Sequence, residues 1–332
     1  MEIFELGDFP LLSGYTLPGA KLSYKTIGTL NAAKDNAILF PHFLGGAPEA
    51  LEGWIGAGLA LDPTKYFFIL PGQFGNGIST SPSNSLPPFN QGAFPACTFA
   101  DDVIAQHKLV TKQFGITELQ LILGWSTGGL QTYEWAVRYA PMVKRVAAIA
   151  TAPKPSPWTR LWLLTLIEEP HTSDPAYNRG FYADQKSMHA GLRRQAHGTA
   201  LTLPPHNFYR DELWKQLGFS SLEDFISRFW EAFWLPQDPN DLIVQARKAR
   251  AADPSQGGDL DAALKSITAK VAVIAFTGDP MFPPDEGKVD AARIPGATFL
   301  EVPSIFGHLA TFQLSQQDVQ TVNAALVDLL AP

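Results

Sequence analysis

The chain of 332 residues has little cysteine, no basic runs and no long apolar segment. Its single cysteine, Cys97, excludes a disulfide bond within the chain. The formal net charge is −7 and no cluster of lysine and arginine stands out, so nucleic acid is not an expected partner. No apolar stretch approaches the roughly 20 residues that span a bilayer. We therefore expect no membrane partner either.

The sequence also lacks the usual motifs for metals and cofactors. Metal-ligand spacings such as H-E-x-x-H and C-x-x-C are absent. The glycine-rich stretch at 72–80, GQFGNGIST, has neither the lysine of a P-loop nor the spacing of a dinucleotide-binding fingerprint. The first residues, MEIFELGDFPLL, show no basic segment followed by an apolar one. We expect a cytoplasmic protein that uses neither a metal nor a cofactor.

Short apolar runs alternate with helical patterns along most of the chain. Residues 98–114 and about 315–330 have helical periodicity; Thr98 and Ser315 each precede an aspartate by three positions, and Gly115 follows the first helix. The runs typical of strands are 22–28, 37–43, 66–71, 119–123, 143–150, 270–276 and 297–303. The later runs are continuously apolar, as in parallel strands covered on both faces. This alternation predicts an α/β protein with a doubly wound, mostly parallel sheet.

The alternation breaks between about Pro153 and Ile267, where no clear buried strand occurs. Residues 222–234 have helical periodicity instead. Five of the eight tryptophans fall in this region, namely Trp158, Trp162, Trp214, Trp230 and Trp234. We predict a core formed by residues 1–153 and 267–332, with residues 154–266 inserted as a helical cap. Most of the aromatic residues are expected to pack cap against core, and some to line an apolar pocket.

The strongest chemical signal is LQLILGWSTGG at 119–129. An apolar run ends at a glycine, Ser126 lies between Gly124 and Gly128, and a helical pattern follows at once. This is a G-x-S-x-G nucleophile elbow in its required context of strand, sharp turn and helix. The helix start leaves free N–H groups near any oxyanion that develops. The pattern predicts that Ser126 is a nucleophile.

A serine nucleophile needs a base, which a third group must orient. Of the seven histidines, only His308 follows a late acid at a strand end. Asp279 and His308 each come directly after a predicted strand, so both should reach the sheet edge that carries Ser126. Asp285 is the rival acid, but it lies further along, in the first turn of a predicted helix. The chain order of serine, acid and histidine is that of the α/β-hydrolases.

Acyl transfer also needs hydrogen-bond donors aimed at the tetrahedral oxyanion. One donor should be the N–H of Thr127, the residue after the nucleophile. The other should come from the loop after an early strand, and residues 40–54 fit because two adjacent glycines permit a tight turn. Phe43 or Leu44 would supply this second N–H. His42 adjoins the loop.

Over nearly its whole length the chain resembles the homoserine O-acetyltransferase family of α/β-hydrolase-fold proteins. The resemblance rests on FELGDFPLLSGYTLPGAKLSYKTIGTLN at 4–31, PHFLGG at 41–46 and GWSTGGLQTYEWAVRYAPMVKRV at 124–146. It implies a ping-pong mechanism through an acyl-serine intermediate and a homodimer joined through the cap helices.

The resemblance also carries over to single residues. Ser126, Asp279 and His308 fall on the triad positions of the family. Leu44 and Thr127 fall on its oxyanion positions, although the family usually has methionine where this chain has Thr127.

The chain departs from the family where the acceptor binds. Family acyltransferases have an aspartate after the catalytic histidine, where this chain has Leu309. They also have an arginine in the first cap helix, at a position near Ile167, and Arg160 lies about two turns away. A zwitterion is costly to desolvate without charged partners. Homoserine is therefore not the expected acceptor, and water would resolve the acyl-enzyme.

We therefore expect a serine hydrolase that cleaves short-chain acyl esters of uncharged alcohols. Its small-molecule substrate would contact Phe43, Trp125, Trp162 and Leu309. The main alternative is an O-acyltransferase that moves an acetyl group from acetyl-CoA to an alcohol such as homoserine. A hydrolase of amides or thioesters and a non-catalytic binding protein are further alternatives, and the intact serine, aspartate and histidine argue against the last.

Overall fold

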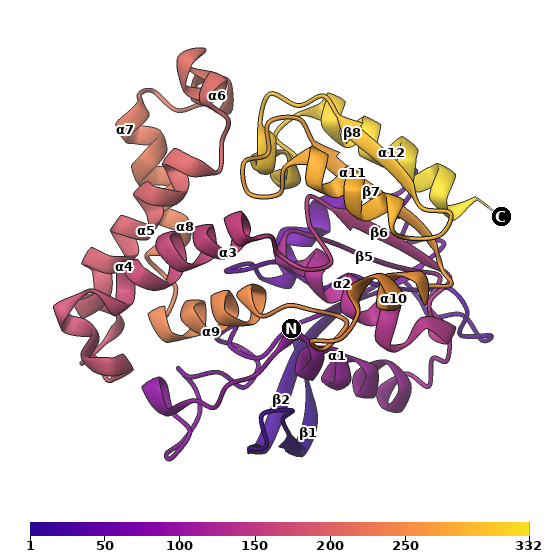
Figure 1. Cartoon of the computed structure of the whole chain (residues 1–332), viewed down its shortest axis with the longest axis horizontal. Helices are drawn as coiled ribbons and strands as arrows, with labels where there is room; N and C mark the ends of the chain where they lie inside the picture. The colour runs from indigo at the N-terminus through magenta and orange to yellow at the C-terminus, as the bar shows by residue number, and fades with distance from the viewer. Residues whose placement is uncertain (332) are drawn as a thin grey trace.

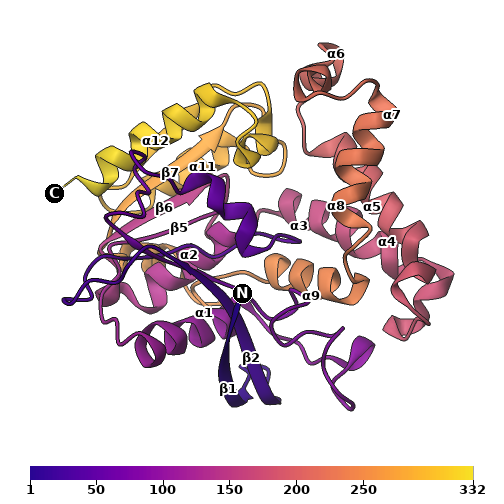
Figure 2. The ribbon, with the colours of Figure 1, turned by 180° about the vertical axis from the view of Figure 1, so that it is seen from behind.

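The computed structural model describes residues 1–331. A single eight-stranded sheet runs through them, with helices on both faces and a further group of helices beside one edge (Figures 1 and 2). The strand order is β1-β2-β4-β3-β5-β6-β7-β8. The bounds are β1 Glu2–Pro10, β2 Thr16–Ile27, β3 Ala37–Leu39, β4 Phe67–Pro71, β5 Leu121–Trp125, β6 Arg145–Ile149, β7 Lys270–Phe276 and β8 Thr298–Val302. From β4 to β8 all neighbouring strands are parallel, which confirms the predicted α/β class.

The helices fall into two groups. Those that pack on the sheet are α1 Phe99–Lys108, α2 Thr127–Arg138, α10 Leu260–Lys265, α11 Pro284–Ala292 and α12 Gln316–Leu330. The others are α3 Pro157–Leu163, α4 Glu169–Thr172, α5 His189–Thr202, α6 His206–Arg210, α7 Leu222–Phe225, α8 Ala232–Trp234 and α9 Pro239–Arg250. These lie to one side of the sheet (Figure 1). As expected, no strand separates β6 from β7 in the described chain; the exact limits of the cap stay a prediction.

The parallel strands alternate between two apolar clusters, one on each face of the sheet. In β5, Leu121 and Leu123 belong to one cluster, and Ile122 between them belongs to the other. Successive side chains of a strand point to opposite faces, so a continuous apolar run buries both. Residues of α1, α2 and α11 complete one cluster, and residues of α12 and of the cap helices complete the other.

Helix ends follow the predicted signals. The Thr98 side chain accepts from the Asp101 N–H, and the Asp101 carboxylate accepts from the Thr98 N–H at 2.7 Å. Ser315 caps α12 in a similar way by accepting from the Asp318 N–H at 3.2 Å. Gly115 follows the helix that starts at α1 and continues through Leu109–Gln113, and it has a φ of +65°. Such a backbone conformation is the usual helix ending and favours glycine.

Three strand predictions were wrong. β2 begins at Thr16, six residues before the run predicted at 22–28. β1 was missed because it is an edge strand paired only with β2, and among its nine residues only Phe9 is buried. Glu2, Glu5 and Asp8 interrupt its apolar residues, so the strand shows no continuous apolar run. β3 ends at Leu39 instead of residue 43. Pro41 has no N–H for a strand ladder, and the chain turns there into the loop that carries Leu44.

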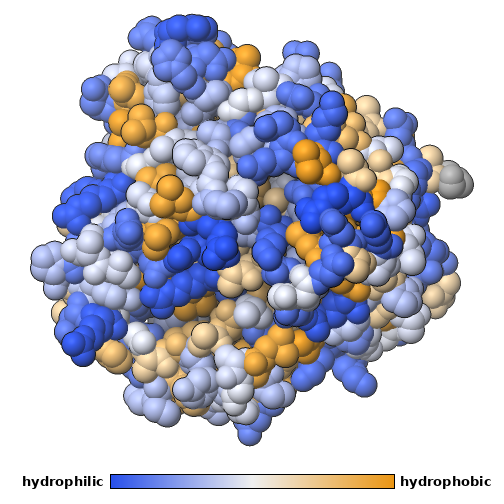
Figure 3. Space-filling view, viewed as in Figure 1, coloured by the Kyte–Doolittle hydropathy of each residue, from blue (hydrophilic) through white to orange (hydrophobic). Residues whose placement is uncertain are grey.

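The surface shows no dominant apolar area on the side seen in Figure 3, where hydrophobic residues are scattered in small groups among hydrophilic ones. Within residues 1–331, no helix is both long and apolar enough to cross a membrane.

A fully buried ion pair ties α9 to α1. Lys248 Nζ lies 2.7 Å from Asp102 Oδ2, and it also donates to Gln73 Oε1 at 2.9 Å and to the Phe74 carbonyl at 2.5 Å. The second carboxylate oxygen, Asp102 Oδ1, accepts from the Phe74 N–H at 2.7 Å. All three ammonium hydrogens therefore have partners. Burial raises the pKa of Asp102 to about 6 even though Lys248 lowers it.

We predict that Lys248→Met lowers the free energy of unfolding by about 3–5 kcal/mol, because it leaves the Asp102 carboxylate buried without its cation. Urea unfolding at pH 7, followed by circular dichroism, measures the change. Lys21→Met is the matched control, since Lys21 forms an exposed pair with Glu5 at 3.3 Å and exposed pairs contribute little. Equal unfolding midpoints for the two variants would contradict the prediction.

Candidate active site

Ser126 occupies a strained turn between β5 and α2. Its backbone angles are φ 53° and ψ −127°, a conformation that is costly for a residue with a side chain. Neighbouring backbone holds the turn in place. The Ser126 N–H donates to the carbonyls of Ile149 and Ala150 at 3.1 and 3.2 Å, and its carbonyl accepts from Thr151 Oγ1 at 2.7 Å. The elbow is thus fixed by the end of β6, the next strand in the sheet.

The glycines on either side of Ser126 allow two close backbone contacts. A Cβ atom on Gly124 would lie 2.5 Å from the carbonyl of Gly128. A Cβ atom on Gly128 would lie 2.5 Å from the Pro41 carbonyl oxygen and 3.3 Å from that of His42. The start of α2 therefore packs directly on the end of β5 at Gly124 and on the loop that follows β3 at Gly128.

The structure joins His308 to Asp279, as the sequence predicted. His308 Nδ1 lies 2.7 Å from Asp279 Oδ2, and both side chains are buried. Asp279 Oδ1 accepts from the N–H groups of Met281 and Phe282, each at 2.9 Å. A carboxylate only accepts, so His308 carries its proton on Nδ1 and leaves Nε2 free to act as a base.

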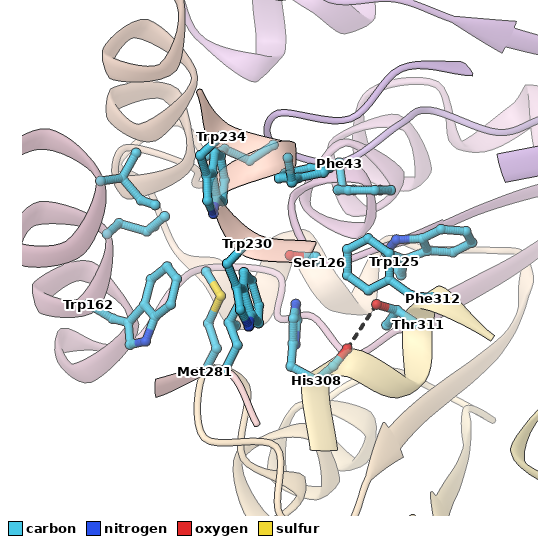
Figure 4. A pocket seen from close by; sticks show the side chains of 15 residues that line it. Phe43, Trp125, Ser126, Trp162, Trp230, Trp234, Met281, His308, Thr311 and Phe312 are labelled. Carbon is cyan, nitrogen blue, oxygen red and sulfur yellow. Dashed lines mark hydrogen bonds between the residues drawn. The ribbon is translucent and has the colours of Figure 1, made fainter. Parts of the chain in front are cut away.

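The rival acid does not reach the histidine. Asp285 is exposed in the first turn of α11, and the structure gives it no hydrogen bond to His308. Ser126 and His308 line the same cavity, and the His308 ring extends towards the Ser126 side chain in Figure 4. No hydrogen bond joins these two side chains in the described structure. Such contacts are often loose before substrate binds.

Free N–H groups surround the elbow. The amides of Phe43, Leu44 and Thr127 donate no hydrogen bond to any described part of the chain. The His42 carbonyl faces the start of α2, where it accepts from Gln131 Nε2 at 3.2 Å. In a trans peptide the N–H points opposite to the carbonyl, so the Phe43 N–H points away from α2. This geometry favours Leu44 over Phe43 as the second oxyanion donor, beside Thr127.

An apolar cavity opens in front of Ser126. Figure 4 shows the side chains around it, which come from the core and from the cap helices. The lining residues are Phe43, Leu44, Trp125, Ser126, Trp162, Leu163, Ile167, Leu203, Trp230, Phe233, Trp234, Met281, His308, Thr311 and Phe312. None of them is an aspartate, glutamate, lysine or arginine. Inside the cavity, the centre of a water molecule can occupy about 50 Å³.

Three of the four predicted substrate contacts line the cavity, and one does not. Phe43, Trp125 and Trp162 lie on its wall, whereas Leu309 is fully buried and is not one of the lining residues. The contact predicted for Leu309 is therefore corrected: although it follows His308, the short helical turn at Gly307–Phe312 takes its side chain into the core. Thr311 and Phe312 of the same turn reach the cavity instead.

Apart from Trp162, the sequence did not predict which cap residues form the wall. Trp230, Phe233 and Trp234 are spaced i, i+3 and i+4, so one face of the helical segment 222–234 presents them all. This spacing was the available signal. Where the cap lies against the core was not visible in the local sequence.

Other reactive groups lie outside the cavity. Burial raises the pKa of Cys97 to about 12, which keeps it a neutral thiol. Within the chain from 1 to 331, no group of three or more His, Cys, Asp or Glu side chains is placed to hold a metal ion.

Comparison with known proteins agrees with the fold and the site. Residues 36–313 match the family described as alpha/beta hydrolase fold. Ethyl acetate hydrolase of Pseudomonas veronii is 40% identical, over 99% of this chain and 95% of its own. Homoserine O-acetyltransferase of Trichormus variabilis is 31% identical, over 90% and 86%. The monoclinic structure of the acetyl esterase MekB matches with a TM-score of 0.96 and 40% identity, over 100% and 96%. The chain therefore belongs to the alpha/beta hydrolase fold family and, within it, is related to both acetyl esterases and homoserine O-acetyltransferases.

Proposed function

We propose that the protein is a serine carboxylic-ester hydrolase that cleaves short-chain acyl esters, above all acetates, of uncharged alcohols. The observation that carries this proposal is the apolar cavity without charged lining residues, which ends at Ser126 beside the Asp279-bound His308. The relatives support it, since two of them are named for the hydrolysis of ethyl acetate and as an acetyl esterase.

In the proposed reaction Ser126 Oγ attacks the ester carbonyl while His308 Nε2 takes the hydroxyl proton. The N–H groups of Leu44 and Thr127 bind the oxyanion that forms. When the intermediate collapses, the ester C–O bond breaks and His308 returns the proton to the leaving alkoxide. A water molecule then attacks the acyl-serine while His308 Nε2 takes a proton from it. His308 returns this proton to Ser126 Oγ as the bond between Ser126 and the acyl group breaks. This step releases the carboxylic acid and restores Ser126.

The size of the cavity favours a small substrate. One buried water needs roughly 10–15 Å³ of space for its centre, and the cavity offers about 50 Å³ of such space. The space thus equals only a few water molecules, enough for an acetyl group and a short alcohol. Bulky tryptophans from both the core and the cap form the wall.

The lining also argues against an amino-acid acceptor. Ile167 faces the cavity near the position where the related acyltransferases are expected to carry an arginine. Arg160, in α3 just before it, is exposed. A zwitterion such as homoserine would lose its hydration without gaining a charged partner. Water is the acceptor that this cavity favours.

Substrate preference tests the proposal. Purified protein should hydrolyse ethyl acetate and p-nitrophenyl acetate, and kcat/KM should fall by about tenfold or more from the acetyl to the octanoyl ester, because a longer chain exceeds the cavity. Thiol release from acetyl-CoA, measured in parallel, should not respond to homoserine. Homoserine-dependent thiol release would identify an acyltransferase and overturn the proposal.

The identity of the acid is tested by two matched variants. Asp279→Asn should lower kcat by roughly 10³–10⁴-fold, because the His308 tautomer is no longer fixed by a carboxylate. Asp285→Asn removes the rival acid on an exposed helix turn and should leave kcat within about twofold of the wild type. Ester hydrolysis is measured for both, with thermal unfolding as the check on folding. Loss of activity in the second variant alone would show that the acid is misassigned.

A further inference from the structure

His42 is a buried histidine that the triad does not use. It lies in the loop after β3, and only 1% of its surface is exposed. Its Nδ1 is 2.9 Å from the carbonyl oxygen of Phe43, and its Nε2 is 3.2 Å from Asn76 Nδ2. It is absent from the cavity wall, so any effect on the reaction must pass through other residues.

The hydrogen bonds of His42 define where its proton lies. The Phe43 carbonyl can only accept, so His42 Nδ1 must carry the hydrogen. The amide of Asn76 is oriented by two N–H groups, of Ile78 at 3.1 Å and Ser79 at 2.7 Å, which donate to its Oδ1. Its Nδ2 therefore donates to His42 Nε2. Burial lowers the pKa of His42 to about 4, in keeping with a neutral ring that accepts at Nε2.

The bond from His42 acts on the peptide group that carries the Leu44 N–H. The Phe43 carbonyl belongs to this peptide, and it also accepts from the Gly46 N–H at 3.1 Å. Because a trans peptide is planar, two donors on its oxygen fix the direction of the N–H on its other side. Hydrogen bonds to the carbonyl also polarise the peptide, which makes its N–H a stronger donor.

We propose that His42 is a positioning residue for the oxyanion hole: by donating from Nδ1 to the Phe43 carbonyl, it aims the Leu44 N–H at the oxyanion formed on Ser126. This inference rests on the proposed function and on Leu44 as the second donor. It assigns a role in the transition state to a side chain that never touches the substrate.

A merely structural role predicts a different outcome, and a second histidine provides the comparison. His171 in α4 is also fully buried; burial lowers its pKa to about 4, and its ring bonds to Gln195 at 2.5 Å. It lies in the cap, away from the loop after β3 that carries Leu44. Loss of either imidazole should weaken the fold, but only the loss of His42 should selectively weaken binding of the oxyanion.

The experiment compares His42→Leu, which removes the donor, with His42→Asn, whose side-chain NH₂ can replace Nδ1. For p-nitrophenyl acetate, the leucine variant should lose about 10–100-fold in kcat, since removing an oxyanion donor outright costs about 10²–10³-fold. Its KM should change less than about threefold. Affinity for a trifluoromethyl ketone, which forms a tetrahedral adduct with the serine, should fall by the same factor as kcat/KM. The asparagine variant should recover most of both losses, and His171→Leu should keep the wild-type kcat.

Several results would overturn the inference. These are a folded His42→Leu variant with the wild-type kcat, an asparagine variant as slow as the leucine variant, or an equal kcat loss in His171→Leu. Should His42→Leu not fold, ¹⁵N NMR of histidine-labelled wild type decides, with the His42 signals assigned through the asparagine variant. An Nδ1–H tautomer at pH 7 is expected, and an Nε2–H tautomer refutes the inference. Absence of ester turnover in the wild type would instead refute the proposed function.

Discussion

The close approach of two backbone segments sets the geometry of the whole site. The first turn of α2 lies against the loop after β3 so tightly that a single methyl group on Gly128 would overlap the Pro41 carbonyl. This contact places the loop that carries Leu44 directly beside the start of α2, which carries Thr127. A larger residue at position 128 would push this loop away from the turn at Ser126, and so separate the proposed oxyanion donors from the proposed nucleophile.

Buried hydrogen bonds hold α2 and the loop after β3 together at that contact. Gln131 of α2 donates to the His42 carbonyl and accepts from Gln106 of α1 at 2.7 Å. From the cap side, Gln245 of α9 accepts from the Gly45 N–H at 3.0 Å. Gln245 lies three residues before Lys248 of the buried ion pair. One face of α9 therefore holds both the loop after β3 and the neighbouring glycine-rich loop. Removal of any one of these partners would leave a polar group buried and unsatisfied, which is costly.

The sequence located the candidate site better than it predicted the shape of that site. Ser126, Asp279 and His308 could be found because an elbow motif is local and parallel strands bring their carboxyl ends to one edge of the sheet. Leu309 was misplaced because a single helical turn decides which side chain faces the cavity. The wall residues Trp230 and Trp234 were missed because the orientation of a cap helix depends on tertiary packing. The edge strand β1 was not predicted because too few of its side chains are buried to give an apolar pattern.

The cavity wall comes from two parts of the chain, and only one of them also carries the proposed reacting groups. Part of the wall lies in the core, beside the proposed triad and oxyanion donors. Another part is the face of the helical segment 226–234 that presents Trp230, Phe233 and Trp234. Substitutions on that face can enlarge or reshape the cavity without displacing the nucleophile or its base. The size of the ester that fits can therefore change through substitutions in the cap, at positions that lie apart from the proposed nucleophile and base.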